Sequence, residues 1–474
     1  MTFDMLNDDV LLQIFEFYVD EDMDIKENWM TLIHVCRRWR SIVFQSPRHL
    51  NLRLHCTPKK QMRDTLDIWP PLPLVIRDFF TTSSRASVVY NFIAALEHND
   101  RVYQIKLNSS QTLKNVVDLA ALQKPFSELT HLKLGTYNND GPMLPDSFLG
   151  GATPRLRSLV LFRIPFPGLP NLLSSATHLV ELNLHNIPPS GYIPPEVMAT
   201  SLSSLTSLEK LSLRFRTPRP GMALDGQSPL PPPPTRSVLP SLIKIDFKGA
   251  SKYLEEILAR IDAPRLKRLR LTVFDEFVFD TPQLFQFISR RPTLRAPEKC
   301  QVTFSSNFIV LKFLSQTFDY GALIVEIPCT GLGLQQLSSF EQICASSLPP
   351  LSMLEDLYLV HEDPALPPYW LDNVDDMLWL RLLHPFAAVK NLYLYKKLVS
   401  RVTPALQELV GERTTEVLPA LENIFLEGFK PSWPFLEGIE EFVAARRLTN
   451  HFVAVSSWNR YSEQKRQGVS WGDL

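Results

Sequence analysis

Hydrophobic residues near the start of the chain recur at steps of one, three and four, which places them on one stripe of a helix. Two such runs occur, formed by Leu6, Val10, Leu11, Ile14, Phe15 and Tyr18, and then by Trp29, Leu32, Val35, Cys36, Trp39, Ile42 and Val43. Asn7 is the expected N-cap of the first helix, and Asp8 and Asp9 suit the positive end of its dipole. The pattern predicts two or three short amphipathic helices that cannot bury all of their apolar surface alone.

From about residue 100 the period changes, and the unit Leu-x-x-Leu-x-Leu recurs. Clear copies end at Leu134, Leu161, Leu184, Leu213, Phe247, Leu271, Leu359, Leu394 and Leu426, with weaker copies at 102–107, 301–304 and 323–327. Alternate leucines of a short strand point to one face, so parallel stacking of the copies buries a continuous apolar column. A doubly wound α/β domain is the alternative, but no glycine-rich phosphate turn supports it.

Composition narrows the class of protein. The net charge of −1 argues against nucleic acid as a partner, and no apolar run is long enough to span a membrane. The first residues do not form a signal peptide, and the five cysteines contain no CxxC pair, so we expect neither disulfides nor zinc. These features predict a cytoplasmic or nuclear protein.

Proline outnumbers glycine by 39 to 17, which is typical of joints that stop one short element and start the next. The insert 217–240 contains Pro231–Pro234 in a row. This run is either a polyproline ligand for an SH3- or WW-type domain or an inserted loop.

The N-terminal residues resemble an F-box, because Leu6, Val10-Leu11, Ile14-Phe15 and Val35-Cys36-Arg37-Arg38-Trp39 follow its pattern. The later units resemble leucine-rich repeats. The combination of an F-box-like start with such repeats resembles the large F-box families of fungi. The resemblance implies that the helices bind a Skp1-type adaptor and through it a cullin. It assigns adaptor binding to Leu6, Val10, Leu11, Ile14, Phe15, Leu32, Val35, Cys36 and Trp39. Asn7 stands where the family has proline, and Asp20–Asp24 resembles an insertion.

The expected fold is α/β, with a short N-terminal F-box helical module followed by an irregular leucine-rich-repeat solenoid that has a parallel sheet on its concave face. We assign residues 1–50 to the module and 51–100 to a cap and first degenerate repeats. Residues 101–430 form the repeat array, and 431–474 form a C-terminal cap and tail. The cap is expected to contain a helix at 435–447 and a strand at 451–455.

The x positions of the strands predict what the concave face presents. Basic groups gather in the middle repeats and aromatic rings in the last ones, as at many binding surfaces. The predicted substrate-facing residues are Lys210, Arg214, Lys244, Lys248, Arg268, Arg270, Tyr358, Tyr393, Tyr395 and Phe425. We hypothesise that a protein substrate presents acidic or phosphorylated residues and an apolar side chain to them. Ordinary solvated surface charge is the alternative.

The predicted function is the substrate-recognition subunit of a Skp1–cullin–F-box ubiquitin ligase. The alternative is a repeat scaffold without a ubiquitin role, whose helices serve only as a cap. We expect no catalytic residues, cofactor or metal, since no GxSxG, P-loop or HExxH pattern occurs and His178, Glu181 and His185 lack a further ligand. An enzyme would need a pocket between repeats. Leu11→Asp and Trp39→Ala are expected to abolish adaptor binding.

Overall fold

The computed structural model describes most of the chain in discrete ranges. These are 6–19, 28–56, 61–78, 86–117, 119–137, 141–217, 236–274, 281–295, 297–305, 308–314, 322–328, 337, 340–341, 351–361, 376–409, 411–428 and 436–459. The Asp20–Asp24 segment, most of the proline-rich insert and the tail after residue 459 lie outside the described residues. The chain divides into two compact units, Met1–Arg216 with Leu239–Ser241 and Thr217–Val238 with Leu242–Leu474.

The first unit begins with three helices: α1 (Asp8–Val19), α2 (Trp29–Ile33) and α3 (Arg37–Gln45). The second hydrophobic stripe is divided between α2 and α3, because Cys36 adopts an extended backbone (φ −156°, ψ 171°) and starts a new helix. Leu11 and Phe15 of α1 and Val43 of α3 form the buried centre of this helical module.

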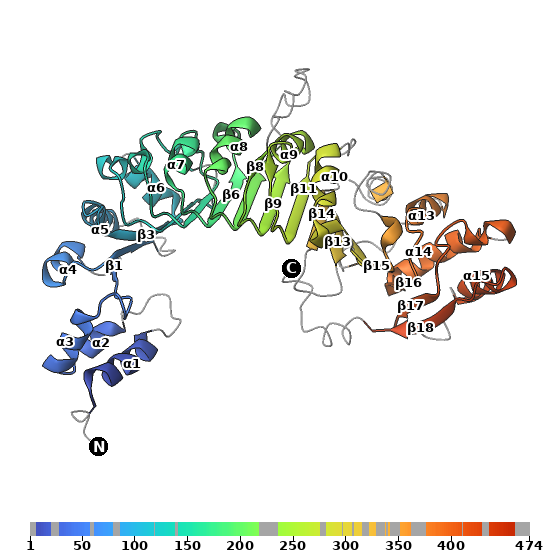
Figure 1. The fold of residues 1–474 in the computed structure, drawn as a ribbon, viewed down its shortest axis with the longest axis horizontal. Helices are drawn as coiled ribbons and strands as arrows, with labels where there is room; N and C mark the ends of the chain where they lie inside the picture. Colours follow the sequence, from blue (N-terminus) through green and yellow to red (C-terminus); the bar gives the residue numbers. More distant parts are fainter. Residues whose placement is uncertain are drawn as a thin grey trace. The chain divides into compact units, whose positions relative to one another are not determined.

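The rest of the first unit alternates strands with helices. Its strands are β1 (Leu54–Cys56), β2 (Leu74–Arg77), β3 (Val102–Leu107), β4 (His131–Gly135), β5 (Ser158–Phe162), β6 (Glu181–Ile187) and β7 (Lys210–Phe215). Its helices are α4 (Met62–Ile68), α5 (Ala86–Leu96), α6 (Ser110–Val117), α7 (Leu169–Ser175) and α8 (Pro195–Ser203), with short 3₁₀ turns at Ala120–Gln123, Phe148–Gly151 and Pro189–Gly191. Helices α5 to α8 lie on one side of the strands (Figure 1).

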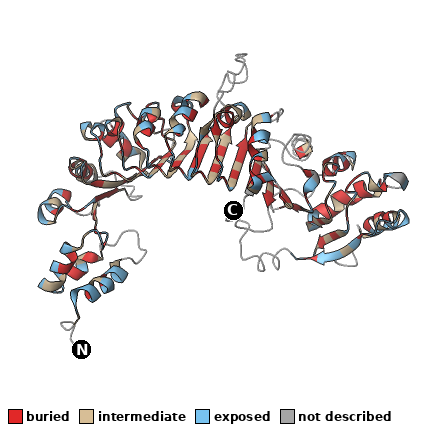
Figure 2. Ribbon diagram, viewed as in Figure 1, coloured by how far each residue is buried: buried red, intermediate tan, exposed pale blue. Residues whose placement is uncertain are grey.

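The strands of this unit pair in chain order and all in parallel. The register aligns the repeat leucines, so that Leu132 pairs with Leu159 and Leu159 with Leu182. These leucines are fully buried, whereas the residues between them are half-buried or exposed (Figure 2). The predicted leucine-rich-repeat-like column is therefore confirmed here, and the doubly wound alternative does not fit this strand order.

The second unit has strands β9 (Lys244–Gly249), β11 (Arg268–Val273), β12 (Lys299–Phe304), β13 (Phe308–Leu314), β14 (Ala322–Pro328), β15 (Asp356–His361), β16 (Asn391–Leu394), β17 (Asn423–Glu427) and β18 (Ala454–Trp458). A small parallel pair joins β8 (Ser237–Val238) to β10 (Ile261–Asp262). The helices are α9 (Ser251–Leu258), α10 (Pro282–Ser289), α11 (Pro292–Arg295), α13 (Asp376–Leu383), α14 (Lys396–Gln407) and α15 (Leu436–Leu448), with 3₁₀ turns at Leu351–Met353 and Gly411–Thr415.

The expected parallel sheet is interrupted in this unit by an antiparallel meander. Strand β13 pairs antiparallel with both β12 and β14, and the spatial order is β9-β11-β14-β13-β12-β15-β16-β17-β18. The weak copies at 301–304 and 323–327 are two of the meander strands. Strand β13 has no leucine-repeat spacing but is buried on both faces, for example at Val310 and Leu311. A continuous apolar run of this kind indicates a strand buried on both faces, and a search for the leucine-repeat spacing does not detect it.

The C-terminal elements largely match expectation. The predicted helix at 435–447 is α15, and the predicted strand begins three residues later than expected, at Ala454. None of the described helices is long and apolar enough to cross a membrane.

Loops between repeats are held by side chains that bond one repeat back, because buried backbone carbonyls need donors. Arg101 donates to the Leu72 carbonyl at 3.0 Å, and Arg446 of α15 donates to the carbonyls of Val417 and Leu418, both at 2.8 Å. Arg446 is fully buried, and burial lowers its pKa to about 10. Its guanidinium lies 5.2 Å from the centre of the Phe442 ring.

We predict that Arg446→Met lowers the free energy of unfolding of the second unit by about 2–4 kcal/mol, because buried carbonyls lose their donors while the apolar stem is kept. Urea unfolding of the full chain measures this change. The exposed Lys397→Met is the control and should stay within about 0.5 kcal/mol of the wild type. Equal stability of both variants would contradict a role for this arginine in holding the loop.

Candidate interaction surfaces

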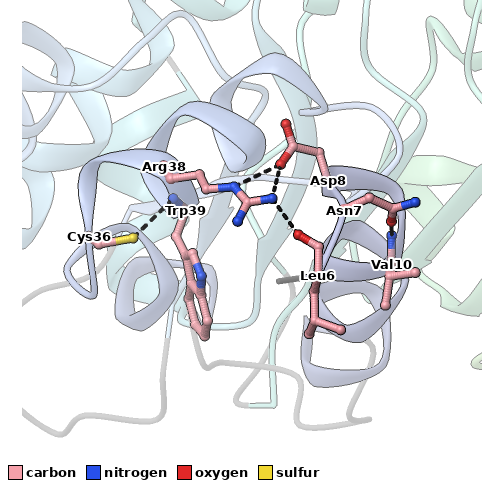
Figure 3. A network of polar contacts seen from close by, with 7 residues as sticks. All are labelled: Leu6, Asn7, Asp8, Val10, Cys36, Arg38 and Trp39. Carbon is pink, nitrogen blue, oxygen red and sulfur yellow. Dashed lines mark hydrogen bonds and ion pairs between the residues drawn. The ribbon is translucent and has the colours of Figure 1, made fainter. Parts of the chain in front are cut away.

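Helix α1 begins as the sequence predicts. Asn7 Oδ1 accepts the backbone N–H of Val10 at 2.8 Å, so the residue in the family's proline position is a working N-cap. Arg38 of α3 donates to Asp8 at 2.7 Å and also to the Leu6 carbonyl (Figure 3). The sequence analysis named Arg38 only as part of the Val35–Trp39 motif. It missed this contact because Asp8 lies 30 residues away in the chain.

The Val-Cys-Arg-Arg-Trp segment forms the start of α3. Cys36 Sγ accepts the backbone N–H of Trp39 at 3.5 Å, so this exposed cysteine serves as the N-cap (Figure 3). The Trp39 ring is half-buried, with its centre 4.8 Å from that of Phe15. The segment therefore connects α3 to the core of the module.

The nine predicted adaptor-binding residues divide by burial. Leu11, Phe15 and Leu32 are buried in the module, Leu6 and Trp39 are half-buried, and Val10, Ile14, Val35 and Cys36 are exposed. Direct contact with a partner in this state is open only to the exposed and half-buried ones. The buried three shape the module instead.

One face of α1 carries large apolar side chains in contact with solvent. Val10, Ile14 and Phe17 follow the i, i+4, i+7 spacing of one helix face, and Tyr18 adjoins them. Their exposed fractions are 38%, 42%, 81% and 41%. We call these four residues the α1 surface. Phe17 was not singled out from the sequence, although its spacing from Val10 and Ile14 was a usable signal.

The opposite part of the module packs against the start of the repeat array. The ring of Trp29 in α2 lies 5.6 Å from that of Trp69, which follows α4, and Phe44 of α3 lies 6.4 Å from the same ring. Trp29 also donates its indole N–H to the Arg53 carbonyl at 3.1 Å. The module is thus attached to the array through α2 and α3.

The basic residues of the second unit lie on the face of β9 and β11 opposite the buried Ile245, Phe247, Leu269 and Leu271. Lys244 and Arg268 are cross-strand partners, and neither forms an ion pair with another described residue. Like charges directly opposite each other in a sheet are unfavourable. This pair therefore places two positive charges directly opposite each other, with the carboxylate of Asp246 two residues further along β9 on the same face.

The neighbouring basic residues have other contacts. Arg270 forms an ion pair with Glu326 of β14 at 2.9 Å, a partner hidden from the sequence because the register of β14 was unknown. Lys248 Nζ lies 5.6 Å from the centre of the Phe274 ring. Lys210 is exposed and Arg214 half-buried on β7 of the first unit.

The predicted aromatic zone is packed on itself. Tyr358, Tyr393 and Phe425 are cross-strand neighbours whose rings stack at 4.0 and 4.5 Å, and Trp458 of β18 lies 5.5 Å from Tyr393. Tyr358 is only 5% exposed, which contradicts its expected role as an open substrate contact. Neighbouring strands are close enough for rings in register to stack and cover one another.

Tyr393, Phe425 and Tyr395 remain partly exposed. Tyr395 stacks on His361 with ring centres 6.1 Å apart.

A polar row that the sequence analysis did not identify runs beside this stack. Lys299 Nζ lies 3.4 Å from a carboxylate oxygen of Asp356, and the Asn391 side chain donates to the other oxygen at 2.7 Å. Asn423 donates to Asn391 at 2.8 Å. Asparagine at the first position of successive strands was the available signal, and the row ties the last repeats together.

Glu181, which lies near His178 and His185 in the sequence, has hydrogen-bond partners within the sheet. Glu181 accepts hydrogen bonds from Ser158 at 3.1 Å and from Asn183 at 2.7 Å. Among the described residues, no three His, Cys, Asp or Glu side chains group in a way that could hold a metal ion.

The described cysteines differ in environment. Cys36, Cys56 and Cys300 are free thiols, of which only Cys36 is exposed. Burial raises the pKa of Cys56 to about 12 and raises that of Cys300 further. The thiolate is the reactive form, so the two buried thiols should be inert at neutral pH.

We predict that iodoacetamide at pH 7.5 modifies Cys36 in the folded chain and leaves Cys56 and Cys300 unmodified. Peptide mass spectrometry resolves each site, and labelling in urea is the control in which all three should react. Rapid labelling of Cys56 in the folded protein would contradict the burial of this thiol in β1.

Comparison with known proteins does not identify a family for this chain. No protein-family model matches the chain, and no curated protein matches it. Among solved structures, the leucine-rich repeat-containing protein LegL7 from Legionella pneumophila matches with 15% identity, covering 82% of this chain and 97% of that one. Its TM-score of 0.26 is too low to support an argument, so the assignment of a leucine-rich-repeat-like solenoid depends on the strand order and register above.

Proposed function

We propose that this chain is the substrate-recognition subunit of a Skp1–cullin–F-box ubiquitin ligase. In this proposal the helical module binds a Skp1-type adaptor, and the repeats bind a protein substrate. The ubiquitin-transfer chemistry belongs to other subunits, so the chain itself needs no catalytic residue, cofactor or metal.

The observation that carries the proposal is the α1 surface. A helix that only capped the array would turn its apolar residues inward, where burial of each large side chain contributes about 1.5–3 kcal/mol. Instead, Ile14 and Phe17 face solvent while α2 and α3 make the contact with the array through Trp29 and Phe44. Exposed apolar residues on one helix face are typical of a partner-binding surface.

The exposed Val35 and Cys36 agree with this interpretation. Both belong to the segment that resembles the end of an F-box, and both are among the positions that the resemblance assigns to adaptor contact. Asn7 stands where the F-box pattern has proline, but its side chain caps α1, so the helix begins normally without that proline.

The α1 surface also changes which substitution tests the proposal. Leu11 is fully buried and Trp39 packs on Phe15, so Leu11→Asp and Trp39→Ala would disrupt the module itself. Exposed positions separate loss of contact from loss of folding.

We predict that Ile14→Asp weakens binding of a recombinant Skp1-type adaptor by roughly 100-fold or more, because a carboxylate would be buried at an apolar contact. Isothermal titration calorimetry measures the affinity, and circular dichroism checks that the helices are retained. Gln13→Asp, the exposed polar neighbour on the same helix, is the matched control and should bind as the wild type does.

Adaptor affinity that is equal in Ile14→Asp and Gln13→Asp would contradict adaptor binding through α1. Failure of the wild type to bind any Skp1-type adaptor would favour the second candidate function. That candidate is a repeat scaffold for protein partners, and the packing of Trp29 and Phe44 on Trp69 supports it, because a capping module needs that contact.

For the substrate, we propose a protein segment carrying acidic or phosphorylated residues. The support is the Lys244 and Arg268 pair, whose mutual repulsion an anion would relieve. Arg270 contributes less free charge because Glu326 already pairs with it.

We predict that the double variant Lys244→Glu/Arg268→Glu reduces recovery of bound proteins roughly tenfold or more in affinity purification under proteasome inhibition. The control is Lys252→Glu/Arg265→Glu, which makes the same charge change at exposed positions off this face. An identical set of captured proteins from both variants would count against an acidic substrate.

A further inference from the structure

The last strand of the array, β18, has an open outer edge. Ala454 donates its N–H to the Glu422 carbonyl, and the Trp458 carbonyl accepts from Gly428, so these residues face β17. In a parallel ladder the alternate residues Val455 and Ser457 then direct their N–H and C=O groups outward. No described residue pairs with that outer edge.

This edge lacks the usual protection. Ala454–Trp458 contains no lysine, proline or bulge, and Ala454, Ser456 and Ser457 are exposed. Unprotected edges are templates for pairing with another strand. Two large apolar side chains just before this strand are also exposed: Leu448, the last residue of α15, at 88%, and Phe452, in the connection to β18, at 69%.

Helix α15 offers a second layer of the same boundary. Its Gly438 lies against Thr403 and Gln407 of α14, and its Glu441 accepts from Gln407, so one flank is occupied. The opposite flank carries Leu436, Glu440, Val443 and Arg447, spaced as one helix stripe. It lies on the side of α15 away from α14.

The charges on that flank are self-complementary. Glu440 lies in the middle of α15 and Arg447 in its last turn, both are exposed, and neither pairs with another described residue. A second α15 placed antiparallel beside the first would bring each Arg447 toward the acidic part of the other helix. Opposite charges placed in this way favour association and set its direction.

We propose that the chain forms a homodimer in which β18 pairs antiparallel with β18 of a second copy and the free flanks of the two α15 helices lie side by side. The two-fold axis passes through Ser456, which brings Val455 opposite Ser457 of the other copy. Each of these residues then both donates and accepts a backbone hydrogen bond. A second copy of this chain fits this surface, because one antiparallel arrangement pairs the backbone groups of the two β18 edges and also places Arg447 of each α15 beside the acidic part of the other.

Sedimentation velocity of the full chain over a concentration series tests the proposal. The wild type should shift from its monomer mass of 54.3 kDa toward twice that value. Val455→Pro removes an outward N–H while leaving the ladder with β17 intact, and should raise the dimer dissociation constant at least about tenfold. Val455→Thr keeps the N–H and is the matched control, which should dimerise as the wild type does.

A charge exchange tests the helix layer without touching the strand. Arg447→Glu should weaken the dimer, and Glu440→Arg combined with Arg447→Glu should restore it, because both copies then carry the exchanged pair. Thermal unfolding checks that each variant is folded. If Val455→Pro does not fold, the charge-exchange variants alone test the proposal. A wild type that stays monomeric throughout, or a folded Val455→Pro that dimerises normally, would overturn the proposal.

Discussion

The structure depends on one constraint: a single strand of this kind cannot bury its leucines, so each repeat is stable only against its neighbours. The parallel register from β2 to β7 meets this need by aligning the leucines into a continuous buried column. Because neighbouring repeats share this column, its apolar residues must be covered by other elements wherever the repeat pattern stops. The features with functional interest lie at such places.

At the start of the array, the closing device is the helical module. Trp29 and Phe44 pack on Trp69, and α1 is left with apolar residues on both its inner and its outer face. In the middle of the second unit, the antiparallel meander brings Glu326 to Arg270. At the last strand the device is only partial, because Trp458 covers the aromatic stack while the backbone edge of β18 has no described partner.

The electrostatics of the strand face opposite the buried core follows from the same register. A basic residue has a local effect only where the neighbouring strand does not supply a carboxylate. Lys299 finds Asp356 and Arg270 finds Glu326, whereas Lys244 faces Arg268. Of the basic residues expected from the sequence on β9 and β11, Lys244 and Arg268 are therefore the two that face each other across the strands. The aromatic zone also depends on the register, because stacking buries Tyr358 and leaves Tyr393, Phe425 and Tyr395 only partly accessible.

The sequence by itself determined the features that depend on neighbours in the chain. It predicted the Asn7 cap, the α15 helix and the alternation that buries Leu132, Leu159 and Leu182, since period and capping chemistry act within a few residues. Only the tertiary structure decided what each face meets. The Arg38–Asp8 pair, the antiparallel β13, the ring stack and the division of α1 between core and solvent join residues tens of positions apart. The local period predicts which face of its helix or strand a residue lies on, but it does not predict which residues from distant parts of the chain pack against that face.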